Sequence, residues 1–202
     1  MKPASLIRMA SLLAVVSMLP SCALVKHFRE LRKKPTAAAA PAQPTAPVLY
    51  EWSGDQVPGA TSVRIALAEQ KARIFKDGEQ VGWTYVATGL SGRSTPTGTF
   101  HVMEKVADKR SNRWGVIVNS SGSTIDGEAR AGREAVPAGG RFVGAPMPHW
   151  MRLTGYGIGM HGGPIPNPGR PASHGCIRLP FEMAGILFNH VEVGTPVVIT
   201  HQ

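Results

Sequence analysis

Hydrophobic residues recur at every second position along much of the chain after residue 60. The alternation runs from Val63 to Leu67 and again from Val81 to Tyr85, which is typical of strands buried on one face. Between them, the run Ala72 to Phe75 leads into Asp77-Gly78, which predicts a tight hairpin turn. Further strand candidates are Gly98 to Val106, Gly115 to Asn119, Met151 to Thr154, Gly157 to His161 and Pro196 to Thr200.

One segment has the periodicity of a helix. From Pro180 to Val191, apolar residues such as Met183 and Leu187 lie at helical spacing, proline stands at the first turn, and Gly194 follows the end. Many short strands with a single good helix predict a mostly β domain, built as a sandwich or a barrel.

The first 21 residues have the features of a secretion signal. Lys2 and Arg8 form a basic start, and Met9 to Leu19 is apolar but too short to span a bilayer as a mature helix. The next residues, Leu19-Pro20-Ser21-Cys22, resemble a bacterial lipobox, in which the cysteine becomes the lipidated first residue of the mature protein. We therefore expect an exported protein, periplasmic or in the cell envelope, anchored to a membrane by lipid on Cys22. An ordinary cleaved signal with an incidental cysteine and an uncleaved anchor are the alternatives.

Residues 22–60 are predicted to form a tether. A short basic segment after Cys22 is followed by Pro35 to Pro47, which consists almost entirely of Ala, Pro, Thr and Gln and has no residue able to anchor a core. The folded part is expected to begin between Val48 and Val63, and residues 61–202 are assigned to one folded domain.

The distribution of charge argues against nucleic-acid binding. The net charge is +9, but seven basic residues and one acidic residue fall within the first 34 positions, which leaves +3 for the rest of the chain. A nucleic-acid-binding domain needs a basic stripe with aromatic residues among it on its folded part. The sequence contains no such stripe, so no nucleic-acid partner is expected.

The states of the two cysteines, Cys22 and Cys176, depend on each other. If Cys22 carries lipid, Cys176 has no intramolecular partner and stays a free thiol, which invites a functional explanation. The alternative is a single disulfide that closes a very long loop.

The densest group of reactive side chains lies between His161 and Arg178. It contains Cys176 and the two histidines His161 and His174, but no carboxylate. A thiol becomes a strong nucleophile when it ionises, and a nearby imidazole promotes this. His161 ends a predicted strand, so the Gly- and Pro-rich loop after it can fold back toward Cys176. His174 lies two residues from Cys176, on the same face of an extended segment, and is the other candidate base.

The residues next to Cys176 suit peptide chemistry. Gly175 lets the backbone approach a substrate carbonyl, and the N–H groups of Gly175 and Cys176 are candidate oxyanion donors. Arg178 adds a positive charge that suits a carboxylate-bearing peptide. His161, His174 and Cys176 are also possible zinc ligands, but no fourth ligand stands nearby. A redox role would need a second thiol close by, so neither a metal nor another cofactor is expected.

These motifs carry a family resemblance. His161, followed after eleven residues by Ser173-His174-Gly175-Cys176-Ile177-Arg178, resembles the signature of the L,D-transpeptidase (YkuD-type) catalytic domain. Upstream, Ser94 to Phe100 is similar to the family's Pro-x-Gly-x-Phe segment, and Met147 to Arg152 is similar to the stretch ahead of the histidine. The similarity covers roughly Val63 to Thr200.

The resemblance implies roles for the residues of the signature. Cys176 is then the nucleophile and His161 the general base, oriented by a backbone carbonyl that we expect from Gly162. His174 is expected to support the loop by hydrogen bonding, and supporting or substrate-binding roles are assigned to Ser173, Gly175 and Arg178. The implied fold is a curved β-sandwich with one main helix after the catalytic cysteine.

The implied reaction is a two-step acyl transfer on peptidoglycan. Cys176 displaces the terminal D-alanine of a tetrapeptide stem, and an amine acceptor, either another stem peptide or a lysine of a wall-anchored protein, resolves the thioester. The alternatives are an L,D-peptidase or carboxypeptidase that hydrolyses the same acyl-enzyme, and a non-catalytic wall-binding lipoprotein. The polar stretch Gly127 to Arg141 is expected to be a long loop that can cover the site.

Overall fold

The computed structural model describes residues 46–202 of the chain. The expected signal peptide, Cys22 and most of the expected tether lie outside the described residues. The elements are β1 (Tyr50–Trp52), β2 (Thr61–Ala66), β3 (Lys71–Lys76), β4 (Glu79–Tyr85), β5 (Gly98–His101), β6 (Glu104–Val118), β7 (Thr124–Arg130), β8 (Arg141–Arg152), β9 (Gly159–Gly162), β10 (Ile177–Leu179), α2 (Phe181–His190) and β11 (Pro196–Thr200). No helix in this part of the chain is long and apolar enough to cross a membrane.

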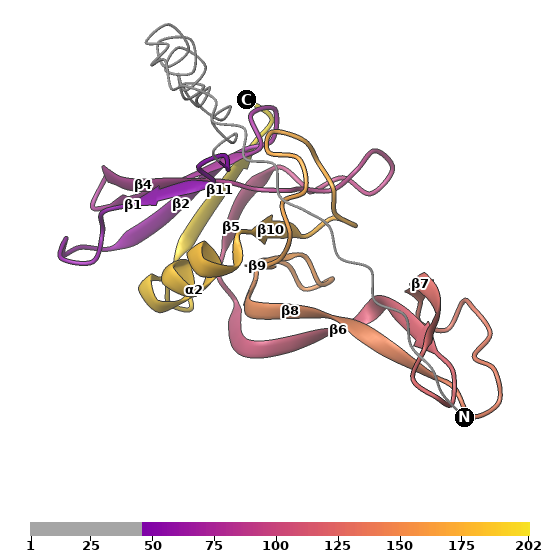
Figure 1. Ribbon diagram of the computed structural model, residues 1–202. Coiled ribbons are helices and arrows are strands. Elements are labelled where there is room, and N and C mark those ends of the chain that lie inside the picture. The colour runs from indigo at the N-terminus through magenta and orange to yellow at the C-terminus, as the bar shows by residue number, and fades with distance from the viewer. Residues whose placement is uncertain (1–45) are drawn as a thin grey trace, which may run out of the picture. The chain divides into compact units, whose positions relative to one another are not determined.

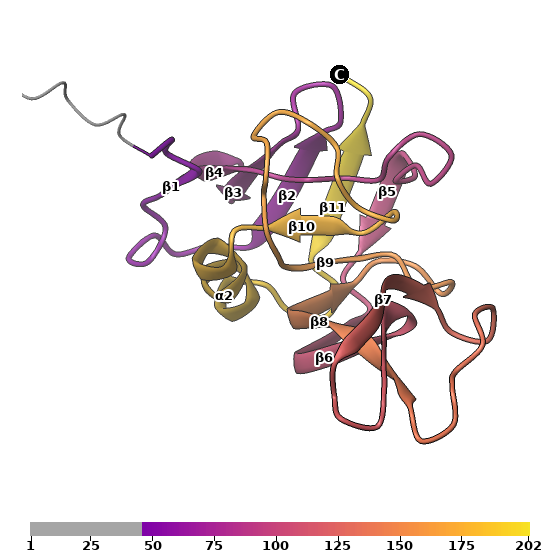
Figure 2. The same cartoon turned by 45° about the vertical axis from the view of Figure 1, so that its right-hand side comes forward.

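The strands form two mixed sheets (Figure 1, Figure 2). One has six strands in the order β1-β4-β3-β2-β11-β5, and the other has five in the order β10-β9-β8-β6-β7. Most neighbouring strands are antiparallel, but β11 runs parallel to β2, and β10 runs parallel to β9. The prediction of a mostly β sandwich with one main helix after Cys176 is therefore confirmed.

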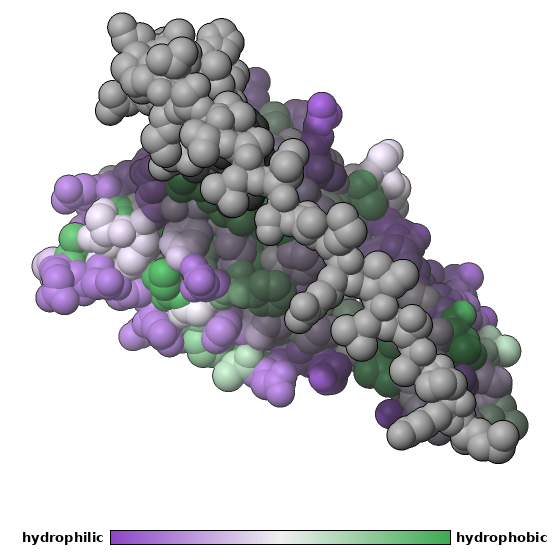
Figure 3. Space-filling view, in the orientation of Figure 1, coloured by the Kyte–Doolittle hydropathy of each residue, from purple (hydrophilic) through white to green (hydrophobic). Residues whose placement is uncertain are grey.

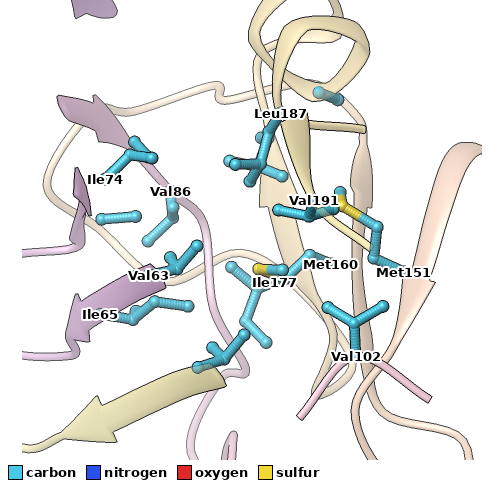
Figure 4. Packing of buried hydrophobic residues seen from close by; sticks show 14 of the residues in the cluster. Val63, Ile65, Ile74, Val86, Val102, Met151, Met160, Ile177, Leu187 and Val191 are labelled. Carbon is cyan, nitrogen blue, oxygen red and sulfur yellow. The ribbon is translucent and has the colours of Figure 1, made fainter. Parts of the chain in front are cut away.

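The hydrophobic core lies between the two sheets and α2 (Figure 4). It contains Val63, Ile65 and Ile74 from the first sheet, Met151, Met160 and Ile177 from the second, and Met183 and Leu187 from the helix. Successive residues of a strand point to opposite faces. Since Met160 and Ile177 point into the core, the residues on either side of them are directed away from it.

Local sequence signals set the first hairpin and the helix as predicted. Asp77 and Gly78 form the turn between β3 and β4 with φ of 46° and 90°, a conformation that Gly adopts freely and Asp tolerates. The helix begins directly after Pro180, and at its other end the Val191 N–H donates to the Leu187 carbonyl at 3.0 Å. Both boundaries agree with the predicted helix to within a residue.

The folded unit begins before residue 61. β1 pairs with β4 at the edge of the six-stranded sheet, and the Tyr50 hydroxyl donates to the Glu182 carboxylate of α2 at 2.7 Å. The expected start of the folded part between Val48 and Val63 agrees with this strand. The tether boundary drawn at residue 60 falls inside the folded unit, because a strand of three residues is too short to give an alternating pattern.

The outer parts of β6 and β8 project with β7 from the body of the domain (Figure 1). We call residues 109–147, which contain these parts, the arm. Here the sequence prediction is wrong: residues 107–114 belong to the single 15-residue strand β6, and Gly127 to Arg130 belong to β7. The strands of the arm were not predicted because their side chains are mostly charged and show no alternation of apolar residues. Backbone hydrogen bonds hold these strands together.

The face of the molecule in Figure 3 is largely hydrophilic, with apolar residues in separate small groups.

Candidate active site

A cavity of about 590 Å³ lies where the arm meets β9 and the segment that leads into β10. Its lining includes Cys176, His161, Gly162, Ser173, His174 and Arg178. All of the residues expected at the site, apart from Gly175 and the lipidation residue, therefore line one cavity.

The pairing of β9 with β10 places the histidine and the cysteine on one face. Arg178 stands opposite His161 in this parallel pair, and Ile177 stands opposite Met160. Residues two apart in an extended segment share a face, so Cys176 points to the same side as Arg178 and His161. The neighbouring pair, Ile177 and Met160, is fully buried in the core. The alternation that builds the core thus also directs the thiol and the imidazole into the cavity.

His161 is held as a neutral ring with one nitrogen available. Its Nδ1 donates to the Gly162 carbonyl at 3.0 Å, as expected, since a carbonyl oxygen only accepts. Nε2 therefore carries the lone pair. Burial, with a smaller contribution from the positive charge of Arg178, lowers the pKa of His161 from 6.5 to about 4, although the bond to Gly162 acts the other way. The ring is therefore neutral at pH 7, and within residues 46–202 it is oriented by a backbone carbonyl and not by a carboxylate.

The segment before Cys176 is fixed by hydroxyl groups. The Ser173 hydroxyl donates to the Cys176 carbonyl at 2.5 Å and accepts from the Gly175 N–H at 3.0 Å. The Thr95 hydroxyl donates to the Gly175 carbonyl at 2.7 Å and accepts from the Gly89 N–H at 2.9 Å. Gly175 has φ of 120°, a conformation that favours glycine. These bonds set the direction of the thiol.

Two expectations for this segment need correction. The Gly175 N–H already donates to Ser173 Oγ, so it is not free to bind an oxyanion. The Cys176 N–H makes no hydrogen bond to another backbone group within residues 46–202 and remains a candidate donor. The His174 ring makes no hydrogen bond within the same residues, so the predicted role of His174 in hydrogen bonding the loop is wrong and falls to Ser173.

The expectation of an ionised thiol is also wrong for the resting site. Burial raises the pKa of the Cys176 thiol, while a backbone bond to Gly159 and the charges of Arg178 and Arg113 lower it by less. The thiol lies 3.8 Å from the Gly157 carbonyl, which can only accept a proton from it. Since His161 is neutral as well, the resting site holds a thiol and an imidazole.

The family model of the YkuD L,D-transpeptidase catalytic domain matches residues 60–199. The chain belongs to this family. Similar folds are found in an L,D-transpeptidase from Mycobacterium smegmatis, at 21% identity and a TM-score of 0.53 over 70% of this chain and 59% of that one. A mutant of the Enterococcus faecium L,D-transpeptidase matches at 26% identity and 0.51 over 70% and 50%. L,D-transpeptidase 3 from Mycobacterium tuberculosis matches at 23% identity and 0.50 over 70% and 61%.

The chain therefore spans half to about three fifths of the length of these solved L,D-transpeptidases. No curated protein matches the sequence. The family match covers both upstream segments singled out in the sequence, and Thr95 shows what the first of them does in this L,D-transpeptidase domain. Its hydroxyl bridges Gly89, in the segment between β4 and β5, to Gly175 in the segment that carries Cys176.

An aromatic stack joins the arm to the same segment. The ring of Trp114 on β6 lies flat on His174, with centroids 4.1 Å apart and planes at 14°. The Arg93 guanidinium stands 4.6 Å from the Trp114 centroid, and that of Arg130 on β7 stands 5.7 Å from it. Burial lowers the pKa of His174, as do the charges of Arg93 and Arg178, against the effect of Glu128. Trp114 was not predicted at the site, because nothing in the sequence around it connects it to residues 60 positions later.

Two residues of the Met147 to Arg152 stretch differ in their position relative to the cavity. His149 is absent from the cavity lining and packs on Phe188 of α2, with ring centroids 5.4 Å apart. Trp150 does line the cavity and is 2% exposed. Within residues 46–202, no three His, Cys, Asp or Glu side chains lie close enough to hold a metal ion. The stretch Gly127 to Arg141, expected to cover the site, contributes no residue to the cavity lining. The arm's side of the cavity is formed by Lys109, residues 111–114 and residues 145–147.

Proposed function

We propose that this protein is a peptidoglycan L,D-transpeptidase, with Cys176 as nucleophile and His161 as general base. The observation that carries the proposal is that His161 of β9 and Cys176, which directly precedes β10, line one cavity, while Nδ1 of His161 donates to the Gly162 carbonyl and leaves Nε2 as the acceptor. Membership of the L,D-transpeptidase family supports the same reaction class.

In the first step, Nε2 of His161 takes the thiol proton as Cys176 Sγ attacks the carbonyl carbon that precedes the terminal D-alanine of a tetrapeptide stem. The carbonyl oxygen becomes an oxyanion, for which the Cys176 N–H is the candidate donor. The C–N bond then breaks, and the departing amine receives the proton from His161. A thioester on Cys176 remains.

In the second step, the amine of an acceptor attacks the thioester and gives its proton to His161. The new peptide bond forms, the C–S bond breaks, and the sulfur recovers the proton. Because thiol and imidazole are both neutral at rest, proton transfer accompanies attack. The nearby charges of Arg178 and Arg113 favour the developing thiolate. The acceptor in this proposal is another stem peptide or a lysine of a wall-anchored protein.

We also propose that the protein is exported and anchored to a membrane. The basic start, the short apolar run and the lipobox-like Leu19-Pro20-Ser21-Cys22 support export and lipid anchoring at Cys22 in the cell envelope. Membrane attachment would hold the domain near peptidoglycan without a separate wall-binding module.

The decisive experiment incubates the purified full-length protein in detergent with a disaccharide tetrapeptide, and separates the products by chromatography with mass detection. We expect cross-linked dimers, or exchange of the terminal D-alanine for an added D-amino acid. Cys176→Ala should abolish both products, and His161→Ala should reduce the rate by a factor of about 100 or more. His174→Ala should cost less, because its ring stacks on Trp114 and is not the proposed base.

The products separate the alternatives. Tripeptide alone, across a range of amine concentrations, would identify a hydrolase acting through the same acyl-enzyme. Bound but unchanged tetrapeptide would identify a non-catalytic wall-binding protein. A dead His174→Ala variant beside an active His161→Ala variant would reverse the assignment of the base.

A further inference from the structure

The arm contains a wide bulge directly over the cavity. β6 pairs with β8 through Arg110 opposite Pro146, and the next registered pair on this side is Gly115 opposite Gly144. Five steps along β6 are thus matched by two along β8. Residues 111–114 of β6 therefore have no partner on β8, although Trp114 still pairs with Arg130 of β7. Bulges of this kind redirect side chains and are common beside active sites.

The bulge has a defined conformation. The Ser111 hydroxyl accepts from the Arg113 N–H at 3.2 Å and from the Trp114 N–H at 3.0 Å, which closes a tight turn. A Cβ on Gly144 would stand 2.0 Å from the Ser111 carbonyl oxygen, so only glycine fits opposite the turn. The stack of Trp114 on His174 fixes the other side of the bulge. Arg113 is therefore held at the cavity wall, next to the segment that carries the thiol.

The charge in the cavity is of one sign. Its lining contains Lys109, Arg113, Arg152 and Arg178, and no Asp or Glu. Arg152 is paired with Glu104 at 2.6 Å. Within residues 46–202, the other three form no salt bridge, although Glu128 of β7 is close enough to act on the pKa of Arg178. The charge of Lys109 acts on the carboxylate of Glu104. Among the described residues, Arg113 is therefore the cation on the arm's side of the cavity for which no acidic partner is found.

The proposed donor peptide carries an anion, its C-terminal carboxylate, close to the bond that is cleaved. Only the amide nitrogen and the α-carbon of the last residue separate this carboxylate from the scissile carbonyl. Arg113 and Arg178 line the same cavity as Cys176, so both cations face the space that this carboxylate would occupy when the scissile carbonyl lies at the thiol. Guanidinium groups bind carboxylates through two parallel hydrogen bonds.

We propose that Arg113, presented by the β6 bulge, binds the carboxylate of the leaving D-amino acid and so directs Cys176 to the peptide bond that precedes a C-terminal residue. The inference rests on the proposed function for the identity of the ligand. The carboxylate site itself can be tested without turnover.

The first test compares two alkylating reagents of the same reactivity type, iodoacetate and iodoacetamide, on the full-length protein, with adducts at the Cys176 peptide measured by mass spectrometry. The ratio of the two rates cancels changes in thiol ionisation. Arg113→Gln should lower the iodoacetate-to-iodoacetamide ratio by about threefold or more, as expected for loss of a partly solvated ion pair. Arg141→Gln is the matched control, because Arg141 lies on the same arm but outside the cavity lining. An unchanged ratio in Arg113→Gln, or an equal fall in Arg141→Gln, would overturn the site.

The second test compares a tetrapeptide ending in free D-alanine with the same peptide ending in D-alanine amide. The wild type should prefer the acid in kcat/KM, and Arg113→Gln should lose most of this preference while still turning over the amide. An equal preference in both proteins would refute the specificity role. If the wild type turns over neither peptide, the proposed function is refuted, and so is the assignment of the carboxylate to a leaving D-amino acid. The alkylation ratio would still decide whether Arg113 forms a carboxylate site.

Discussion

At the scale of single residues, the protonation state of the site follows from burial. His161 lines the cavity but is largely buried, and burial lowers its pKa from 6.5 to about 4. In the unfolded chain this ring is protonated below pH 6.5, whereas in the folded domain it is protonated only below about pH 4. Stability contributed by the neutral ring is therefore lost as the pH falls through this window.

We predict that His161 makes the domain acid-sensitive. Between pH 7 and pH 4.5, wild type should lose about 2 to 3 kcal/mol more of its unfolding free energy than His161→Gln, whose side chain does not titrate. Urea unfolding of both proteins at the two pH values measures the difference, and carboxylates common to both cancel. Equal losses in the two proteins would show that the ring is protonated in the folded state near its ordinary pKa.

Thr95 is a second residue whose role can be isolated. It is 4% exposed and joins the Gly89 N–H to the Gly175 carbonyl. Thr95→Val keeps the shape but leaves both groups unpaired, which should cost about 1 to 3 kcal/mol in unfolding free energy and reduce turnover. Thr95→Ser should restore most of both, and Thr99→Val, exposed on β5, should change neither. If Thr95→Val is as active and as stable as the wild type, the two hydrogen bonds of Thr95 do not contribute to the site.

At the scale of elements, the arm is the part on which the cavity depends. Its two long strands supply one wall of the cavity, and the bulge at Ser111 to Trp114 contacts the segment before Cys176. The core lies elsewhere, between the sheets and α2. Changes to the arm should therefore affect the reaction more than the stability of the domain.

Two glycines of the arm offer a matched comparison. Gly144→Ala places a methyl group against the Ser111 carbonyl and must displace the bulge, whereas Gly127→Ala meets nothing within 4 Å. We predict a loss of turnover of about 100-fold for Gly144→Ala, since small displacements of substrate-positioning groups have effects of this size, and little change for Gly127→Ala. Steady-state kinetics and thermal unfolding of both variants measure this. Equal activities would mean that the bulge does not position the substrate.

At the scale of the whole molecule, the two cysteines are assigned to different tasks. The proposed anchor at Cys22 lies outside the described residues, and Cys176 is a free thiol in the folded domain. We predict that the wild type partitions into detergent and that its mature form begins at an acylated Cys22. Cys22→Ser should give a soluble or unprocessed protein, while Cys176→Ser should partition like the wild type. Phase separation and intact-mass measurement test this, and an unmodified amino terminus in the soluble fraction of the wild type would exclude lipidation.

The sequence by itself determined the elements whose signals are local. The hairpin at Asp77-Gly78 and the helix from Phe181 to His190 lie where turn chemistry and helical spacing predicted them. The motif around Cys176 was sufficient to indicate the family, and the resemblance implied the Gly162 carbonyl that the structure places behind His161. The mostly β fold followed from the alternation of apolar residues, which records burial on one face of a strand.

Only the tertiary structure decided the arm, the stack and the charge state of the site. The charged outer part of β6 has no apolar period, because its ladder needs only backbone groups and its side chains stay hydrated. The stack of Trp114 on His174 joins residues far apart in the chain, and no local pattern encodes such a contact. The neutral thiol and imidazole were missed because the pKa of Cys176 and that of His161 depend on how much water the packed fold removes from each side chain.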